Sequence, residues 1–332
     1  MTTSTRAFKT KGAVSADDIT AALQPKFAVS FGTERTNSRT WLDTFDWRLY
    51  SAGVPLEFID DGPLTAHLPN GAVLNCPQPA KDWPVLVDDL PPGRLRETLD
   101  EVVAPRALLP VVTTRRTVSE NRVLNDDDKT VARLIIERNG DDVSWIQVHP
   151  LRGYDSDADR IAARLSDVAR FTEIAISPYD EALTHAERRP AEDSGPRLTA
   201  ATPAPKAVAA VLGRYAAVIE DNVACTIEAI DIEFLHDLRV AVRRTRSVLK
   251  LVGDVLPDDL AARFAPEFKW LGDLTTPVRD LDVYLLDFGG MAGGLTSAAP
   301  SDLEPFRSFL QRHRTAERRR LVRGLRSRRF ER

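Results

Sequence analysis

The feature that most constrains the fold is a change in the pattern of apolar residues across residues 186–205. This segment, AERRPAEDSGPRLTAATPAP, contains four prolines, many small residues and no apolar periodicity, which is the composition of a linker. Short alternating runs precede it, and long helix-permissive runs follow it. We therefore predict two domains, at residues 1–185 and 206–332, a division that suits a chain of 332 residues.

The first domain carries the signals of an antiparallel sheet. Residues 130–138 (TVARLIIER) and 143–149 (VSWIQVH) are β-branched runs that flank the hairpin signal NGDD, and a further strand is expected within residues 30–49. Helices are expected at residues 16–23, 93–103 and 160–171. Strand pairs with interspersed helices predict an antiparallel α+β domain.

The second domain reads as all-α. Its predicted helices cover residues 206–228, 234–255, 260–274, 278–288 and 303–329. Residues 289–302 (GGMAGGLTSAAPSD) are expected to form a flexible loop, and no GK[ST] follows their glycines, so a phosphate loop is not indicated. The predicted fold class is therefore α+β, with a helical bundle after the sheet domain.

Charge is distributed unevenly along the chain. The net charge is −4, but residues 1–196 carry −8 and residues 197–332 carry +4, and the last 21 residues hold ten arginines against two glutamates. Such a localised basic field attracts polyanions. The sequence contains no run of about 18 apolar residues, so a membrane span is not expected, and the N-terminus lacks the apolar core of a signal peptide. The isolated Cys76 and Cys225 suit a reducing cytoplasm.

A basic stripe is predicted on the helix at residues 234–255. At about 100° per residue, one sector roughly 80° wide contains His236, Arg239, Arg243, Arg246 and Lys250. Arg244 flanks the stripe. Such a stripe is usually a solvated face, but like charges three and four residues apart repel, and Asp237, the only acid nearby, lies off the stripe. Arginine forks suit phosphate oxygens, so the pattern favours an anion site.

The same residues carry a resemblance. HDLRVAVRRTRSVLK (236–250) followed by LGDLTTPVRDLDVYLL (271–286) resembles the CHAD domain, the conserved histidine α-helical domain. The resemblance implies a helical module that binds inorganic polyphosphate, at polyphosphate granules of the cytoplasm, through a basic surface. The implied binding residues are His236, Arg239, Arg243, Arg244, Arg246 and Lys250, with Lys269 and Arg279 as weaker candidates. The family module usually has two related halves, and residues 206–332 correspond to about the first.

Other charged residues of this domain leave alternatives open. Asp280 and Asp282 would lie about 200° apart on a helix, so a metal site is not expected. We expect Asp280 to pair with a nearby arginine and Asp282 to orient a neighbouring residue. Arg314 and Arg318 either supplement the basic surface or belong to a frayed basic tail. No stacking aromatics accompany the stripe, and Phe330 is the only aromatic residue among the last twenty, so nucleic acid is not the expected partner.

The first domain carries a second resemblance. SRTWLDTFDWRLYSAGVPLEF (38–58) is similar to the second-strand signature of the CYTH superfamily, the triphosphate tunnel metalloenzymes. The matching positions are Thr40, Asp43, Thr44, Asp46, Leu49, Gly53 and Leu56. The resemblance implies an antiparallel β-barrel, or tunnel, in which paired glutamates of an E-x-E strand hold Mg²⁺ or Mn²⁺ against a triphosphate.

This chain departs from that pattern at the residues that would hold the metal. Its first strand reads TRAFKTK, without glutamates, and Glu57 occupies the position of an expected phosphate-binding arginine. Trp145, Gln147 and His149 line the strand face where the second E-x-E is expected, while Arg115 and Arg116 remain as auxiliary anion contacts. We therefore expect a non-catalytic polyphosphate-binding protein without a cofactor. The alternative is a triphosphatase acting on tripolyphosphate or a nucleoside triphosphate, which alone requires Mg²⁺ or Mn²⁺.

Overall fold

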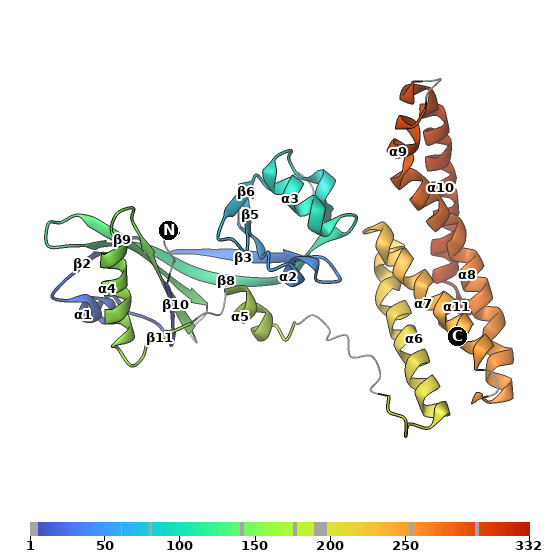
Figure 1. Cartoon of the computed structure of the whole chain (residues 1–332), viewed down its shortest axis with the longest axis horizontal. Helices are drawn as coiled ribbons and strands as arrows, with labels where there is room; N and C mark the ends of the chain where they lie inside the picture. The colour runs from blue at the N-terminus through green and yellow to red at the C-terminus, as the bar shows by residue number, and fades with distance from the viewer. Residues whose placement is uncertain are drawn as a thin grey trace. The chain divides into compact units, whose positions relative to one another are not determined.

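The computed structural model describes residues 6–60, 62–79, 82–139, 143–174, 178–188, 198–252, 255–295 and 299–332. The chain divides into two compact units, which are shown in Figure 1. The first contains Met1–Val103 and Leu108–Pro190, and the second contains Ala104–Ala107 and Ala191–Arg332. The predicted linker includes residues 189–197, which lie outside the described residues.

The first unit is built on one antiparallel sheet, as predicted. Its described strands are β1 (Arg6–Lys11), β2 (Ala28–Ser30), β3 (Arg35–Asp43), β4 (Leu56–Ile59), β5 (Leu64–His67), β6 (Val73–Cys76), β7 (Val85–Leu86), β8 (Ala107–Leu124), β9 (Thr130–Asn139), β10 (Val143–Pro150) and β11 (Thr172–Glu173). The main path runs β11-β1-β10-β9-β8-β3-β4-β5-β6, and β2 and β7 pair with β8.

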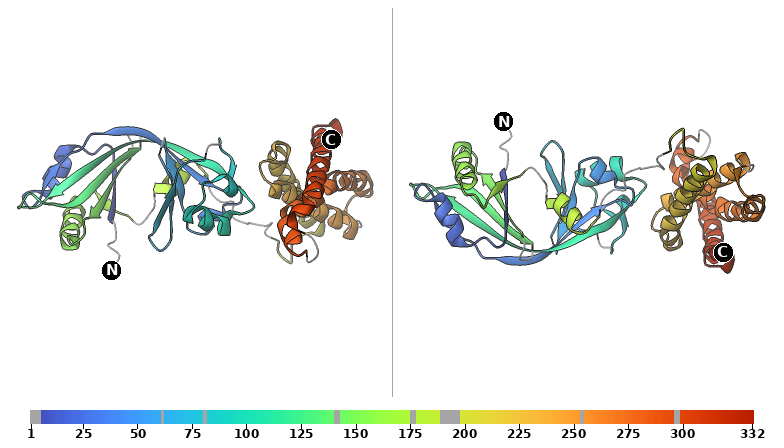
Figure 2. Two further views of the ribbon diagram at one scale, coloured as in Figure 1. Left: turned by 90° about the horizontal axis from the view of Figure 1, so that it is seen from above. Right: turned by 90° about the horizontal axis from the view of Figure 1, so that it is seen from below.

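The expectation of a closed barrel is wrong. The sheet curves strongly (Figure 2), but among the described strands β11 and β6 remain its two unpaired edges. The reason lies in the edge strands themselves, because β11 has two residues and β6 has four. Strands this short offer few ladder hydrogen bonds for closure.

Two apolar cores cover the outer face of this sheet. Alternate residues of β9 and β10, such as Leu134 and Ile146, pack beneath α1 (Ala16–Leu23) and α4 (Asp155–Ser166). Ser15 starts α1 with a capping box: its hydroxyl accepts from the Asp18 amide at 3.1 Å. A second core, beneath α2 (Arg48–Ser51) and α3 (Arg94–Val103), buries residues of β3, β4 and β5. The inner face carries buried charged side chains together with a smaller apolar cluster around Trp41.

The second unit is helical, as predicted. Its described helices are α6 (Ala204–Glu228), α7 (Ile232–Leu251), α8 (Asp258–Leu286), α9 (Phe288–Gly293), α10 (Glu304–Leu325) and α11 (Arg328–Glu331). A common core of α6, α7, α8 and α10 buries Leu238, Leu271, Leu274 and Leu321 among others. A smaller cluster around Phe288 joins α8, α9 and α10.

Two predicted boundaries in this unit are wrong. The helices expected at residues 260–274 and 278–288 form one helix, α8, with Pro266 and Pro277 inside it. Residues Leu274 and Val278 on either side of Pro277 are both buried in the common core, and this packing outweighs the cost of proline in a helix. The predicted loop begins instead with α9, because Phe288 and Ala292 lie one helical turn apart and are buried together.

Candidate functional site

Helix α7 presents the predicted basic stripe. Asp231 caps its first turn by accepting from the Glu233 amide at 2.8 Å and the Phe234 amide at 3.2 Å. The cap fixes the start of the helix, and the buried side chains Phe234, Leu235, Leu238, Ala241, Val242, Thr245 and Leu249 fix its rotation. The stripe residues consequently lie on the other side, where His236 and Arg239 are half-buried. Arg243, Arg246 and Lys250 are exposed.

A groove of about 340 Å³ runs between α7 and α8 along this stripe. It is lined by His236, Arg239, Val240, Val242, Arg243 and Arg246 of α7 and by Gly272, Thr275, Thr276, Arg279 and Val283 of α8. Four of the six α7 residues predicted for binding therefore meet in one depression, together with Arg279. We call this depression the basic groove.

Arg239 is the fixed cation of the basic groove. Its Nη1 donates to the Thr276 hydroxyl at 2.7 Å, to the Thr275 hydroxyl at 3.1 Å and to the Gly272 carbonyl at 3.4 Å. Burial lowers the pKa of Arg239, the charge of Asp280 opposes this shift, and the cations Arg279 and Arg243 add to it. An arginine nevertheless stays protonated at neutral pH, so the groove keeps an anchored positive charge.

Arg246 approaches the groove across a glycine. A Cβ atom at Gly272 would lie 3.1 Å from Arg246 Nη1, which is tighter than ordinary packing. The absence of a side chain at residue 272 thus leaves room for the guanidinium. Arg279 is already paired, since its Nη1 donates to the Ile232 carbonyl at 3.1 Å and to Glu233 Oε1 at 3.2 Å.

The other candidates on α7 and α8 lie outside the basic groove. Lys269 forms an ion pair with Asp273 at 2.7 Å, and both side chains are exposed. Arg244 and Lys250 are exposed and do not line the groove. Asp237 pairs with Arg106, whose short segment groups with the helical unit, so this acid is matched by its own cation.

Arg314 and Arg318 have structural partners. Arg314 forms an ion pair with the buried Asp282, whose pKa is raised by burial and lowered in part by that guanidinium. Arg318 donates to the carbonyls of Thr226 at 3.0 Å and Ile227 at 2.6 Å, at the C-terminal end of α6. Both arginines fasten α10 to neighbouring helices, and the ion pair with Arg314 is formed by Asp282, which was expected only to orient a neighbouring residue.

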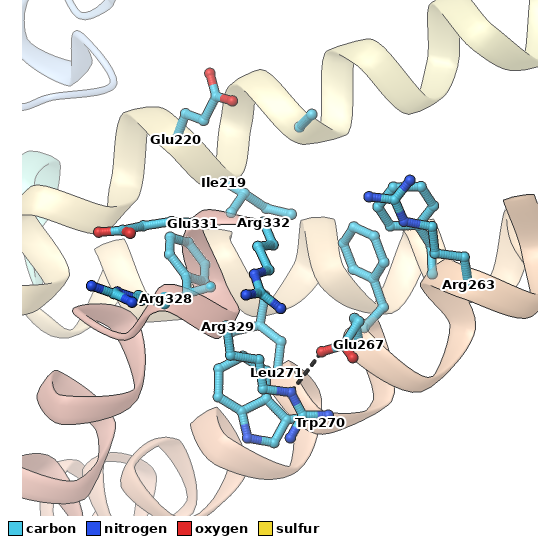
Figure 3. A pocket seen from close by; sticks show the side chains of 14 residues that line it. Ile219, Glu220, Arg263, Glu267, Trp270, Leu271, Arg328, Arg329, Glu331 and Arg332 are labelled. Carbon is cyan, nitrogen blue, oxygen red and sulfur yellow. Dashed lines mark hydrogen bonds and ion pairs between the residues drawn. The ribbon is translucent and has the colours of Figure 1, made fainter.

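A second cavity, of about 730 Å³, lies between α6, α8 and α11 (Figure 3). Its walls combine apolar residues such as Ile219, Leu271 and Phe330 with charged ones. The charged residues are Glu220, Arg263, Glu267, Arg328, Arg329, Glu331 and Arg332. Arg329 donates to Glu267 at 2.6 Å and lies 4.5 Å from the centre of the Trp270 ring. The arginines of this cavity therefore share it with carboxylates, whereas no described carboxylate lines the basic groove.

The inner face of the sheet holds a buried ion-pair network. Arg39 donates to both oxygens of Glu137, at 2.9 and 3.0 Å, and its Nε lies 2.7 Å from Glu57 Oε2. Arg116 donates to Glu137 at 2.6 Å, and His67 Nε2 lies 3.0 Å from Glu57 Oε1. Burial raises the pKa of Glu57, but the His67 hydrogen bond and the Arg39 charge outweigh it, so the pKa is lowered overall.

Helix α5 (Pro178–His185) packs on the same inner face. Tyr179 and Leu183 are buried with Trp41, and Glu181 lies 2.6 Å from Lys9 Nζ on β1. The resemblance allows two alignments of the first strand, and in one of them Lys9 stands where a metal-binding glutamate is expected. A carboxylate of the chain itself, Glu181, faces Lys9.

The other candidate residues of the sheet unit lie on β8 and β10. Gln147 and His149 do share one side of β10, because Gln147 Oε1 and His149 Nε2 are 3.0 Å apart. Arg116 is buried within the network, whereas Arg115 is exposed. Each of the carboxylates Glu57, Glu137 and Glu181 has a cationic partner from the chain itself.

The described residues contain no group of three or more His, Cys, Asp or Glu side chains arranged to hold a metal ion. Within the same residues, no helix combines the length and apolarity that a membrane crossing requires.

Comparison with known proteins gives different results for the two units. Residues 210–332 match the family model of the CHAD domain, which confirms the resemblance of the second unit. No curated protein matches the chain.

Solved structures resemble the first part of the chain at low identity. One is a protein from Hippeastrum with adenylyl cyclase and dominant triphosphatase assignments in its description (14% identity, TM-score 0.38, covering 56% of this chain and 97% of that one). A second is an adenylate cyclase candidate from Vibrio parahaemolyticus (13%, TM-score 0.31, 54% and 98%). A third is a protein from Pyrococcus horikoshii (9%, TM-score 0.30, 56% and 100%).

The sequence analysis did not identify several residues of the basic groove and of the inner face of the sheet. Gly272, Thr275 and Thr276 shape the basic groove, and their only signal was the row of small residues in LGDLTTP. Arg39 and Glu137 form the centre of the sheet network. Glu137 could have been found, because in TVARLIIERN it falls on the strand face opposite the apolar Leu134 and Ile136.

Proposed function

We propose that the CHAD domain at residues 210–332 binds inorganic polyphosphate in the basic groove. The observation that carries the proposal is the convergence of Arg239, Arg243 and Arg246 on one groove, where none of the three forms an ion pair with a described carboxylate. Guanidinium groups aligned along a groove match the closely spaced oxygens of a phosphate chain. Binding would require no metal or other cofactor.

The three arginines have different roles in this proposal. Arg239 is held by its threonine and carbonyl acceptors and supplies a fixed charge at the floor. Arg243 and Arg246 are exposed at the rim and can turn toward a ligand. Because Arg244 and Lys250 are exposed outside the groove, they would add to the long-range field rather than contact the chain.

The test is a binding titration with labelled polyphosphate and the full chain. The variant carries Arg243→Glu and Arg246→Glu, and the matched control carries Arg263→Glu and Arg307→Glu, which reverse the same number of charges elsewhere in the unit. We expect the groove variant to lose binding at concentrations where the control still saturates. Equal losses in the two variants would show that only net charge matters and would refute the groove.

The alternative function, a metal-dependent triphosphatase, would act on the inner face of the sheet. A triphosphate there would have to displace carboxylates that already pair with Lys9, Arg39 and Arg116. We therefore propose a structural or auxiliary role for this unit. Phosphate release from tripolyphosphate with Mg²⁺ or Mn²⁺, abolished by Lys9→Ala and Arg115→Ala, would contradict that role.

Polyphosphate granules are the corresponding proposed location. A fluorescent fusion of the chain should overlap with granules stained for polyphosphate, and the Arg243→Glu, Arg246→Glu variant should be dispersed.

A further inference from the structure

Helix α10 has two faces of different character. At about 100° per residue, its buried side carries Leu310, Leu321 and Leu325 together with the two structural arginines described above. The opposite side, a sector of roughly 140°, carries Phe306, Phe309, Arg312, His313, Arg319, Arg320 and Arg323. All seven are exposed, and they extend over about 26 Å of helix. We call these seven residues the outer face of α10.

Aromatic rings occupy the first part of the outer face. The Phe306 and Phe309 rings lie 6.4 Å apart with planes 12° from parallel, and the Phe309 and His313 rings lie 6.1 Å apart with planes 8° from parallel. Phe306 and Phe309 are 51% and 53% exposed, although Phe306 also contacts the buried Phe288. Large aromatic side chains aligned in this way and left in water mark a surface that another molecule covers.

Arginines occupy the second part. Within the described residues, Arg312, Arg319 and Arg323 form no ion pair, and Arg320 reaches only the i−3 residue Glu317, at 3.8 Å. Arg319 and Arg323 are four residues apart and repel each other. The outer face therefore combines flat rings with a row of cations, whereas the described residues of the basic groove include no phenylalanine, tyrosine or tryptophan and only the single imidazole of His236.

We propose that the outer face of α10 binds single-stranded nucleic acid. Exposed bases would stack on Phe306, Phe309 and His313, and the phosphates of the same strand would lie against the arginines that follow. Inorganic polyphosphate supplies the charge but has no ring to stack, and a duplex keeps its bases paired. The combination therefore selects a single strand.

This site does not depend on the polyphosphate proposal. It lies on a different helix from the stripe, and none of its residues lines the basic groove. The sequence analysis did not identify the outer face of α10, because Phe306 and Phe309 precede the arginine-rich segment by several residues. Only helical spacing brings the two groups onto one face.

The experiment compares two strands of equal charge by fluorescence anisotropy, with the full chain. The first is a labelled oligothymidylate of about 12 nucleotides, within usual site sizes, and the second is an abasic-spacer strand of the same length. We expect the oligothymidylate to bind more tightly. The Phe306→Ala, Phe309→Ala variant should lower its affinity by about tenfold or more and leave the abasic strand unaffected. Circular dichroism would confirm the helix content of the variant.

Two further measurements separate this site from the basic groove. Polyphosphate binding should be unchanged in the Phe306→Ala, Phe309→Ala variant and lost in the Arg243→Glu, Arg246→Glu variant, while oligothymidylate binding should show the reverse. Equal affinity for the abasic and thymidine strands would overturn the proposal. So would preferential binding to anionic phosphatidylserine vesicles, which would assign the aromatic rings to a membrane surface.

Discussion

The salt dependence of polyphosphate binding can be calculated from the basic groove. Three arginines, Arg239, Arg243 and Arg246, face the groove without a carboxylate partner among the described residues, and Arg279 is not counted because it pairs with Glu233. Each phosphate neutralised on a single-stranded polyanion contributes about −0.7 to the slope of log K against log salt. Three contacts give a slope of about −2.1, so affinity should fall about 18-fold between 50 and 200 mM salt.

The perturbation is Arg243→Gln, which removes one of these charges without introducing a carboxylate. The slope should then be about −1.4, and the same fourfold increase in salt should lower affinity only about sevenfold. The assay is the anisotropy of labelled polyphosphate at four KCl concentrations between 50 and 400 mM. Arg244→Gln is the matched control, because Arg244 is the next residue on the same helix and lies outside the groove. An unchanged slope in Arg243→Gln, or an equal change in the control, would refute the reasoning.

Three other predictions concern single residues. Arg246→Gln should weaken polyphosphate binding severalfold, because it removes one of the charges that line the groove; the titration used for the groove variant measures this, and full affinity would show that Arg246 is not a contact. Glu137→Gln should destabilise the sheet unit by about 3–5 kcal/mol, because it leaves two buried arginines without their shared carboxylate; urea unfolding followed by tryptophan fluorescence measures the loss, and a change below about 1 kcal/mol would contradict it. Glu57 has a lowered pKa in the folded state, so its stabilising contribution is complete above its unfolded pKa of about 4.3 and is lost as the pH falls through the folded value. Thermal unfolding between pH 3 and 7 should therefore show a steeper loss of stability in acid for the wild type than for Glu57→Gln, and identical profiles would contradict the lowered pKa.

Local sequence patterns were sufficient for much of the fold. The NGDD signal predicted the β9–β10 hairpin, which pairs Asn139 with Val143, and helical spacing predicted α1 with its correct bounds. Pro277 misled the reading of α8 because local propensity penalises proline in a helix, whereas the burial of Leu274 and Val278 depends on contacts made by distant parts of the chain.

The candidate site shows the same division. The angular position of the cations on α7 follows from helix geometry alone, and the structure places Arg243 and Arg246 side by side on the groove. The contribution of α8 was beyond sequence reasoning, because which residues of α8 face Arg239 depends on how the two helices cross. Lys269, a weaker candidate implied by the resemblance, pairs with Asp273 and lies outside the groove, which the sequence pattern did not indicate.

The hydrogen bonds that hold Arg239 in place have a consequence for the length of the ligand. One guanidinium is fastened to the floor by three acceptors, while its two neighbours on α7 remain free to rotate. A repeating anion can slide by one unit past such an arrangement and find an equivalent partner at each position. The groove would therefore recognise the spacing of negative charge along a phosphate chain but neither end of the chain. It would bind short and long chains through similar contacts.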